Sequence, residues 1–136
     1  MSDFDFRVNN GLVVASNAVV GGSIVMDVIR TSVTSNVIVN TSTTIIDTQP
    51  INVVRSARYH VQAVTDNAYQ SSWILLVHDS ADSYLTEYAI VSSIGLPLIN
   101  YSTDISNGNV RLLGSSNFST SHVWFQKTTV ETAAND

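Results

Sequence analysis

Residues 104–111 read DISNGNVR, and the Asn107-Gly108 pair at their centre decides the fold. Asn-Gly favours a two-residue type I′ turn, because both central residues of that turn need positive φ. Strand-like runs stand on both sides, over residues 98–106 and 109–114. The stretch therefore predicts an antiparallel hairpin whose register is set by this turn.

The same pattern extends through the second half of the chain. Val, Ile and Thr recur there in runs of strand length, and no long stretch shows helical spacing. Short turns rich in Asp, Asn and Ser separate the runs. The expected strands are residues 57–64, 69–78, 83–92, 98–106, 109–114 and 119–129. This spacing predicts an all-β fold, an antiparallel β-sandwich of jelly-roll-like form, with less than about one-tenth helix.

Alternation along two of these strands predicts which side chains face the core. Tyr59, Val61 and Ala63 share one face and are expected inside, whereas His60 lies on the opposite face. Both faces of the strand over residues 83–92 are fairly apolar, which predicts burial on both sides.

The two tryptophans, Trp73 and Trp124, have two interpretations. Each stands among apolar neighbours, which favours a place in the core. The alternative is an exposed platform on which a sugar ring stacks, as in a lectin-like receptor binder. We expect the core.

The chain divides near Pro50. Residues 1–50 hold short β runs with few large side chains, and we interpret them as an N-terminal β-rich arm or oligomerisation segment. Residues 51–130 hold both tryptophans and all five tyrosines and are the predicted β-sandwich domain, and residues 131–136 are a flexible acidic tail. The alternative is that residues 1–50 complete the sandwich of their own subunit.

Apolar side chains in the first 50 residues are the candidate contact site. Their polar neighbours are mostly Ser, Thr and Asn, which pair across a contact without the cost of burying charge. We therefore predict a symmetric homo-oligomer. The predicted subunit or capsid contact residues are Leu12, Val14, Ile24, Val37, Val39 and Ile45.

Charge and composition narrow the classes of function. The 136 residues carry a net charge of −5, and Lys127 is the only lysine beside scattered arginines. Neither nucleic-acid binding nor attraction to a membrane surface is expected from so few cations. Charged residues make up 12% of the chain, against about 25% in an average domain. A surface with so few charged residues is typical of chains that pack against copies of themselves. The absence of cysteine excludes disulfides and thiolate metal sites.

No stretch carries a recognisable catalytic or cofactor motif. His78, Asp79 and Asp82 stand close together in a loop, where they either bind a divalent metal or shape the turn through Asx hydrogen bonds. The turn is the favoured interpretation. Glu87 is the only glutamate outside the tail, whereas acid–base catalysis needs paired carboxylates. We expect no catalytic residues, no cofactor and no metal.

Four stretches resemble a β-domain of virion structural proteins from tailed bacteriophages, particularly large phages of cyanobacteria. They are residues 58–62 (RYHVQ), 76–79 (LVHD), 84–88 (YLTEY) and 104–113 (DISNGNVRLL). Residues 10–14 (NGLVV) resemble the openings of phage fibre and appendage repeats. The resemblance covers the second half of the chain well and the N-terminal third weakly. It implies a virion component of the fibre, appendage or capsid-decoration type, built as a homo-oligomer with a trimer as the first guess.

Fibre proteins of this kind carry many stalk repeats, whereas this sequence carries one domain. That difference favours a small capsid-decoration (cement) protein or a short fibre or tail accessory subunit. The implied partners are other copies of the chain and virion proteins such as the major capsid protein or tail proteins. The implied location is the virion, after synthesis in the host cytoplasm. Capsid and tail locations both stay open, and the alternative function is a receptor- or carbohydrate-binding module on a phage appendage.

Overall fold

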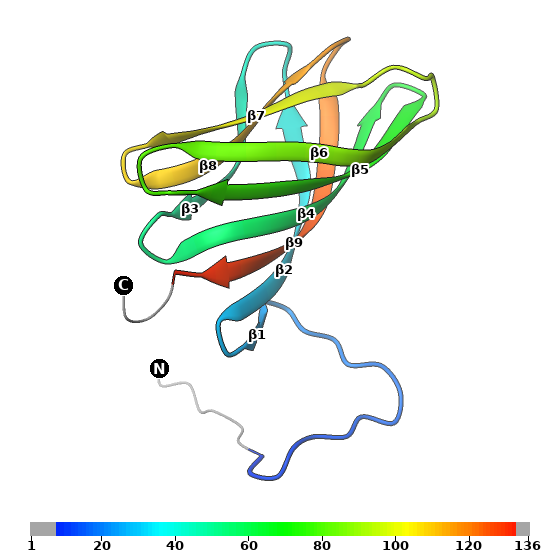
Figure 1. Cartoon of the computed structure of the whole chain (residues 1–136). Coiled ribbons are helices and arrows are strands. Elements are labelled where there is room, and N and C mark those ends of the chain that lie inside the picture. The colour runs from blue at the N-terminus through cyan, green and yellow to red at the C-terminus, as the bar shows by residue number, and fades with distance from the viewer. Residues whose placement is uncertain (1–7, 133–136) are drawn as a thin grey trace, which may run out of the picture.

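The computed structural model describes residues 8–132 and shows two antiparallel β-sheets that pack face to face (Figure 1). No helix occurs among these residues, so none is long and apolar enough to cross a membrane. The strands are β1 (Ile24–Met26), β2 (Ile29–Val39), β3 (Thr44–Pro50), β4 (Val54–Thr65), β5 (Ala68–His78), β6 (Ser83–Ser92), β7 (Ile99–Ser106), β8 (Asn109–Ser116) and β9 (Ser121–Glu131). The predicted all-β antiparallel sandwich is confirmed.

The two sheets differ in size. The larger sheet has the strand order β1-β2-β9-β4-β5-β6, and the smaller sheet has the order β3-β8-β7. The last strand, β9, lies between β2 and β4 and pairs with both, so that Gln126 stands opposite Val33 on one side and His60 on the other. Contacts between distant parts of the sequence therefore hold the larger sheet together.

The core lies between the centre of the larger sheet and the smaller sheet. Tyr59, Val61 and Ala63 on β4 are buried, and His60 on the same strand is exposed, as alternation predicts. The buried apolar cluster comprises Val39, Ile46, Ala57, Tyr59, Val61, Ala63, Ile74, Leu76, Leu98, Ile99, Val110, Leu112, Val123 and Phe125. Both sheets contribute to it, because β2, β4, β5 and β9 of the larger sheet and the three strands of the smaller sheet turn apolar side chains toward the opposite sheet.

The Asn107-Gly108 turn joins β7 to β8 as the sequence predicts. Asn107 has φ of 52° and Gly108 has φ of 77°, and Ser106 pairs with Asn109 directly across the turn. Two residues with positive φ match the right-handed twist of the flanking strands. The register of the hairpin follows from this turn.

The prediction that the strand over residues 83–92 is buried on both faces is wrong. This strand is β6, the edge of the larger sheet, and Tyr84, Tyr88 and Val91 are exposed. Its inward side chains, Leu85 and Glu87, are only half-buried. Apolar residues on both faces here reflect an exposed apolar edge of the molecule.

Strands from the first 50 residues belong to both sheets. β2 pairs with β9 in the larger sheet, and β3 pairs with β8 in the smaller one. Val39 and Ile46 from these strands lie in the core. Residues 1–7 of the predicted arm and 133–136 of the predicted tail lie outside the described residues.

Candidate interaction surfaces

The six predicted contact residues divide into an exposed group and a buried group. Val37 is partly buried against the core and Val39 is completely buried within it, so both stabilise their own chain. The exposed group is Leu12, Val14, Ile24 and Ile45. Contact of this group with another subunit stays a prediction.

The residues ahead of β2 form an exposed and uncharged segment. Residues 8–26 contain no Asp, Glu, Lys or Arg. Residues 8–20 precede β1 and leave the sandwich as an irregular chain (Figure 1). Leu12, Val13 and Val19 are 70%, 94% and 96% exposed. The segment therefore presents several exposed apolar side chains with no charge among them.

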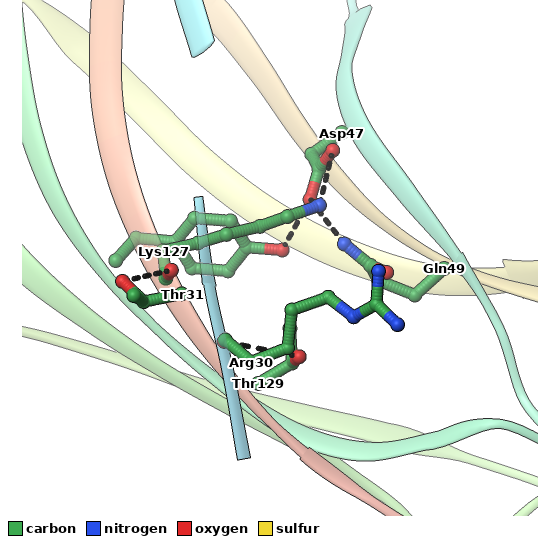
Figure 2. Close-up of polar contacts among 7 residues, drawn as sticks. Arg30, Thr31, Asp47, Gln49, Lys127 and Thr129 are labelled. Atoms are coloured by element: carbon green, nitrogen blue, oxygen red, sulfur yellow. Dashed lines mark hydrogen bonds and ion pairs between the residues drawn. The ribbon is translucent and has the colours of Figure 1, made fainter. Parts of the chain in front are cut away.

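A polar cleft of about 560 Å³ lies where β2 diverges from the smaller sheet. Its lining comes from β2, from the end of β3, from the start of β4 and from β9, together with Gly21, Gly22 and Ser23. Arg30 on β2 lines this cleft (Figure 2). Its guanidinium donates to the Ser23 hydroxyl at 3.2 Å. The cleft therefore offers hydrogen-bonding groups on the inner face of a strand.

An ion pair with two further hydrogen bonds lies beside this cleft, and two of its members, Lys127 and Gln49, line the cleft (Figure 2). Lys127 Nζ lies 2.9 Å from Asp47 Oδ2 and 3.2 Å from Oδ1. Tyr59 Oη and Gln49 Nε2 each donate to Asp47 Oδ2 at 2.8 Å. Burial, followed by the Asp47 charge, holds the pKa of Tyr59 far above its usual value, so this tyrosine stays a neutral donor. The cluster ties β3 of the smaller sheet to β4 and β9 of the larger one.

The prediction that both tryptophans lie in the core is wrong. Trp73 on β5 and Trp124 on β9 lie on the outer face of the larger sheet, where Trp124 is 36% exposed and Trp73 is half-buried. The His60 ring stacks on Trp73 with centroids 4.7 Å apart and 16° between planes, and Arg58 Cζ lies 5.1 Å from the Trp73 centroid. These contacts fix the Trp73 ring against the sheet.

A shallow hollow of about 170 Å³ lies beside Trp124 on this outer face. Gln62 stands opposite Trp124 in the sheet, and Gln126 stands opposite His60. His60 is held in place by its stack on Trp73 and by a 3.1 Å hydrogen bond with Ser71. The hollow therefore combines the Trp124 ring with two amides and an imidazole, and Val33 and Phe125 complete its lining, which contains no Asp, Glu, Lys or Arg.

The loop after β5 is a hydrogen-bonded turn, which confirms the favoured interpretation of His78, Asp79 and Asp82. Asp79 Oδ1 accepts from the N–H groups of Ala81 at 3.0 Å and Asp82 at 2.7 Å. These backbone donors, Asp82 first, hold the pKa of Asp79 below its usual range. His78 is buried, with Nε2 donating to Val54 O at 2.6 Å and Nδ1 accepting from Ser80 N at 3.0 Å. Both ring nitrogens are thus used in the fold, and residues 8–132 contain no group of three His, Asp or Glu placed to hold a metal.

Glu87 lies on the inner side of β6 as part of a second polar cluster. Its Oε2 accepts from Ser72 Oγ at 2.6 Å and from Gln70 Nε2 at 3.2 Å. Burial raises the pKa of Glu87, and these two hydrogen bonds oppose the rise. The nearby Tyr101 hydroxyl is buried and has no hydrogen-bond partner among the described residues. Burial and then the Glu87 charge raise the pKa of Tyr101, so it too stays protonated.

No protein-family model matches the chain, and no curated protein matches it. Among solved structures, the chain is similar to the tailspike protein of Acinetobacter phage vB_ApiP_P1, with 10% identity and a TM-score of 0.47, over 93% of this chain and 25% of that one. It is also similar to the tailspike protein of Acinetobacter baumannii phage AM24, with 8% identity and a TM-score of 0.41, over 78% of this chain and 27% of that one. The chain thus spans about a quarter of the length of either tailspike protein.

Proposed function

We propose that the chain is a non-enzymatic structural subunit of a tailed-phage particle that works by self-association and by docking on other virion proteins. Within that class, a small capsid-decoration (cement) protein and a short fibre or tail accessory subunit are the two forms that fit. The observation that carries the proposal is the exposed, uncharged segment over residues 8–26. The assignment to a phage particle rests on the sequence resemblance of the second half.

The chemistry of this segment favours a protein partner. Its exposed side chains are aliphatic, and covering them removes apolar area from water at about 25 cal/mol per Å². The polar residues between them are Ser and Asn, which pair across a contact without the several kcal/mol that an unpaired buried charge costs. In a symmetric homo-oligomer, other copies of the chain would cover these apolar side chains. The choice of a trimer rests on the family resemblance alone.

Light scattering on two forms of the protein tests self-association. The full chain is expected to be an oligomer at micromolar concentration, and a shortened chain beginning at Ser23 is expected to be a folded monomer. The shortened chain keeps every strand of both sheets. A full chain that is monomeric at this concentration would contradict self-association.

A second shortened chain, beginning at Ile51, tests the interpretation of residues 1–50 as a separable arm. It lacks β1, β2 and β3, together with the buried Val39 and Ile46. If residues 24–50 are part of the domain, this chain is expected to unfold. A chain from Ile51 that melts cooperatively near the full-length temperature would favour the separable arm.

Carbohydrate or receptor binding is the second candidate function, and the outward position of both tryptophans favours it. The hollow beside Trp124 offers an aromatic face for the C–H groups of a pyranose ring, with Gln62 and Gln126 amides to meet its hydroxyls. Titration of the full chain with a panel of neutral oligosaccharides, followed by tryptophan fluorescence, tests it. Binding that is lost in Trp124→Ala and kept in the control Tyr69→Ala would support the site. No response to any sugar of the panel, or a response that survives Trp124→Ala, would oppose it.

A further inference from the structure

The smaller sheet leaves part of the larger one uncovered. The smaller sheet has three strands and the larger sheet has six. Arg30, Ser32 and Thr34 on the inner face of β2 line the cleft, so this part of β2 is not fully covered by the smaller sheet. β3 forms the edge of the smaller sheet on this side, since β8 is its only partner among the described strands. One further strand beside β3 would extend the smaller sheet over this part of β2.

The backbone of β3 has free hydrogen-bonding groups on that edge. Ile51 N donates to Gly108 O at 3.1 Å, so its N–H faces β8. In an antiparallel ladder the direction alternates, which turns Gln49 toward β8 and Thr48 away from it. Pro50 also faces away and has no N–H, so it ends the usable edge. Thr48 is not itself among the residues that line the cleft, but the next two residues, Gln49 and Pro50, do line it. The backbone at Thr48 is therefore an open pairing site beside the cleft.

The exposed N-terminal segment has the composition and length of the missing strand. Residues 11–20 read GLVVASNAVV, which contains no charge and is rich in β-branched Val. Ten residues extend over about 33 Å as a strand, whereas the seven residues of β3 span about 23 Å. In alternation, Leu12, Val14 and Val20 share a face with Ser16, which suits a cleft whose wall mixes Val53 and Pro50 with polar groups.

The segment does not occupy the cleft of its own chain. Gly21 and Gly22 line the cleft and none of residues 11–20 does, and the chain before Gly21 runs away from the sandwich (Figure 1). A segment that points outward from one cleft is placed to enter the cleft of a neighbour, and the exchange of identical elements between copies is a common route to dimers.

We propose that residues 11–20 of one copy lie in the cleft of a second copy as an added strand beside β3. This inference rests on the self-association proposed above and names the surfaces that it uses. The backbone around Thr48 provides the pairing, and the side chains of the segment cover the uncovered inner face of β2. The interaction is a strand addition, in which main-chain hydrogen bonds give affinity and alternate side chains give register.

The absence of cysteine from the chain allows a direct test by cross-linking. Two full-length variants of different tag size, Val14→Cys and Thr48→Cys, are co-expressed and treated with a short bis-maleimide. The expected product is a heterodimer that joins the two tags. The matched control replaces Thr48→Cys with Ser102→Cys, an exposed position on β7 at the opposite edge of the same sheet. Cross-linking no higher than with Ser102→Cys would overturn the inference.

A double variant separates exchange between copies from folding back within one chain. Val14→Cys with Thr48→Cys in the same chain is expected to give mainly cross-linked dimers and higher species. A cross-linked monomer as the main product would show that the segment fills its own cleft, which overturns the inference. Light scattering on the same sample separates the strand addition at β3 from self-association in general. An oligomer without the heterodimer cross-link refutes only the strand addition, whereas a monomer refutes self-association as well.

A backbone variant gives an independent measurement. Thr48→Pro removes an N–H that β8 does not use, and it is expected to weaken self-association at least tenfold. Thr48→Ala keeps that N–H and is expected to associate as the unchanged chain does. Equal association of the two variants, with both folded by their melting curves, would overturn the pairing at β3.

Discussion

Asp47→Ala is expected to lower the free energy of unfolding by about 3 kcal/mol. The substitution leaves the Lys127 ammonium without its carboxylate, and breaking a buried pair in this way costs about 3–5 kcal/mol. It also leaves the buried Tyr59 hydroxyl without an acceptor, for which about 1–3 kcal/mol is typical. These two costs overlap, so they do not add in full. The side chains of Lys127 and Asp47 are 15% and 14% exposed, so water reaches the Lys127 ammonium. We therefore expect the lower end of the range of about 3–5 kcal/mol.

Urea unfolding followed by tryptophan fluorescence measures this loss. The transition midpoint should fall while the m value stays constant, because the change does not alter how much surface unfolding exposes. For a chain of this size, about 3 kcal/mol corresponds to a decrease in Tm of about 10 °C. Circular dichroism at pH 7 gives the Tm independently.

Asp104→Ala is the matched control. Asp104 pairs with Arg111 at 2.6 Å on the β7–β8 hairpin, but their side chains are 40% and 26% exposed. Solvent screening makes such a pair weak, so the loss should be clearly smaller than for Asp47→Ala. The triple variant Asp47→Leu, Lys127→Met, Tyr59→Phe removes every charge of the cluster and should recover much of the stability. Equal losses for Asp47→Ala and Asp104→Ala would refute the reasoning.

Three further predictions concern other parts of the fold. Gly108→Val places a β-branched residue at positive φ and should cost about 1–3 kcal/mol, and an unchanged Tm would contradict the type I′ turn. Glu87→Gln should flatten the pH dependence of the free energy of unfolding. Burial raises the pKa of Glu87 in the folded protein above the value near 4.5 of the unfolded chain. The stabilisation by protonated Glu87 is therefore complete below pH 4.5 and is lost as the pH rises through the pKa of the folded protein. Urea midpoints of both proteins at pH 4 and pH 7 check this, and an equal difference at both values opposes it. Gly114→Ala puts a Cβ 2.6 Å from Ile46 Cδ1 and 3.1 Å from Ile99 Cγ2, so thermal melting should show a loss of about 1–2 kcal/mol.

Strands and turns were predictable because their signals are local. Period-two alternation identified β4 through Tyr59, Val61 and Ala63, and the special φ of Asn107 and Gly108 identified the β7–β8 turn. The Asx hydrogen bonds of Asp79 follow from the side chain and its own backbone. None of these features depends on which strands become neighbours.

The positions of the tryptophans were predictable by alternation, but the prediction used composition instead. Trp73 alternates with Ser72 and Ile74, both of which are buried, so period two places its ring on the outer face. Counting apolar neighbours along a strand mixes the two faces, because successive residues point in opposite directions. The error at β6 has another cause, since the sequence does not tell an exposed apolar edge strand from a central one.

The Asp47 cluster and the cleft were beyond prediction because they depend on sheet order. Asp47 and Lys127 are 80 residues apart in sequence. They meet only because β9 inserts between β2 and β4, while β3 crosses to the other sheet. Local patterns carry no information on that arrangement. The only sequence feature that points to this cluster is that Lys127 is the single lysine of the chain. That feature does not indicate which carboxylate Lys127 pairs with.

The same strand supplies both candidate surfaces, and alternation keeps them apart. On β9, Lys127 points inward to Asp47 and the cleft, whereas Trp124 and Gln126 point outward to the hollow. The cleft is polar and lies beside an open backbone edge, which suits an added strand. The outer face pairs an aromatic ring with amides, which suits a polar ligand or a wet interface. Because the sheet lies between them, both surfaces are available at once, and a substitution at Trp124 tests the outer face without altering the contacts that hold the cleft.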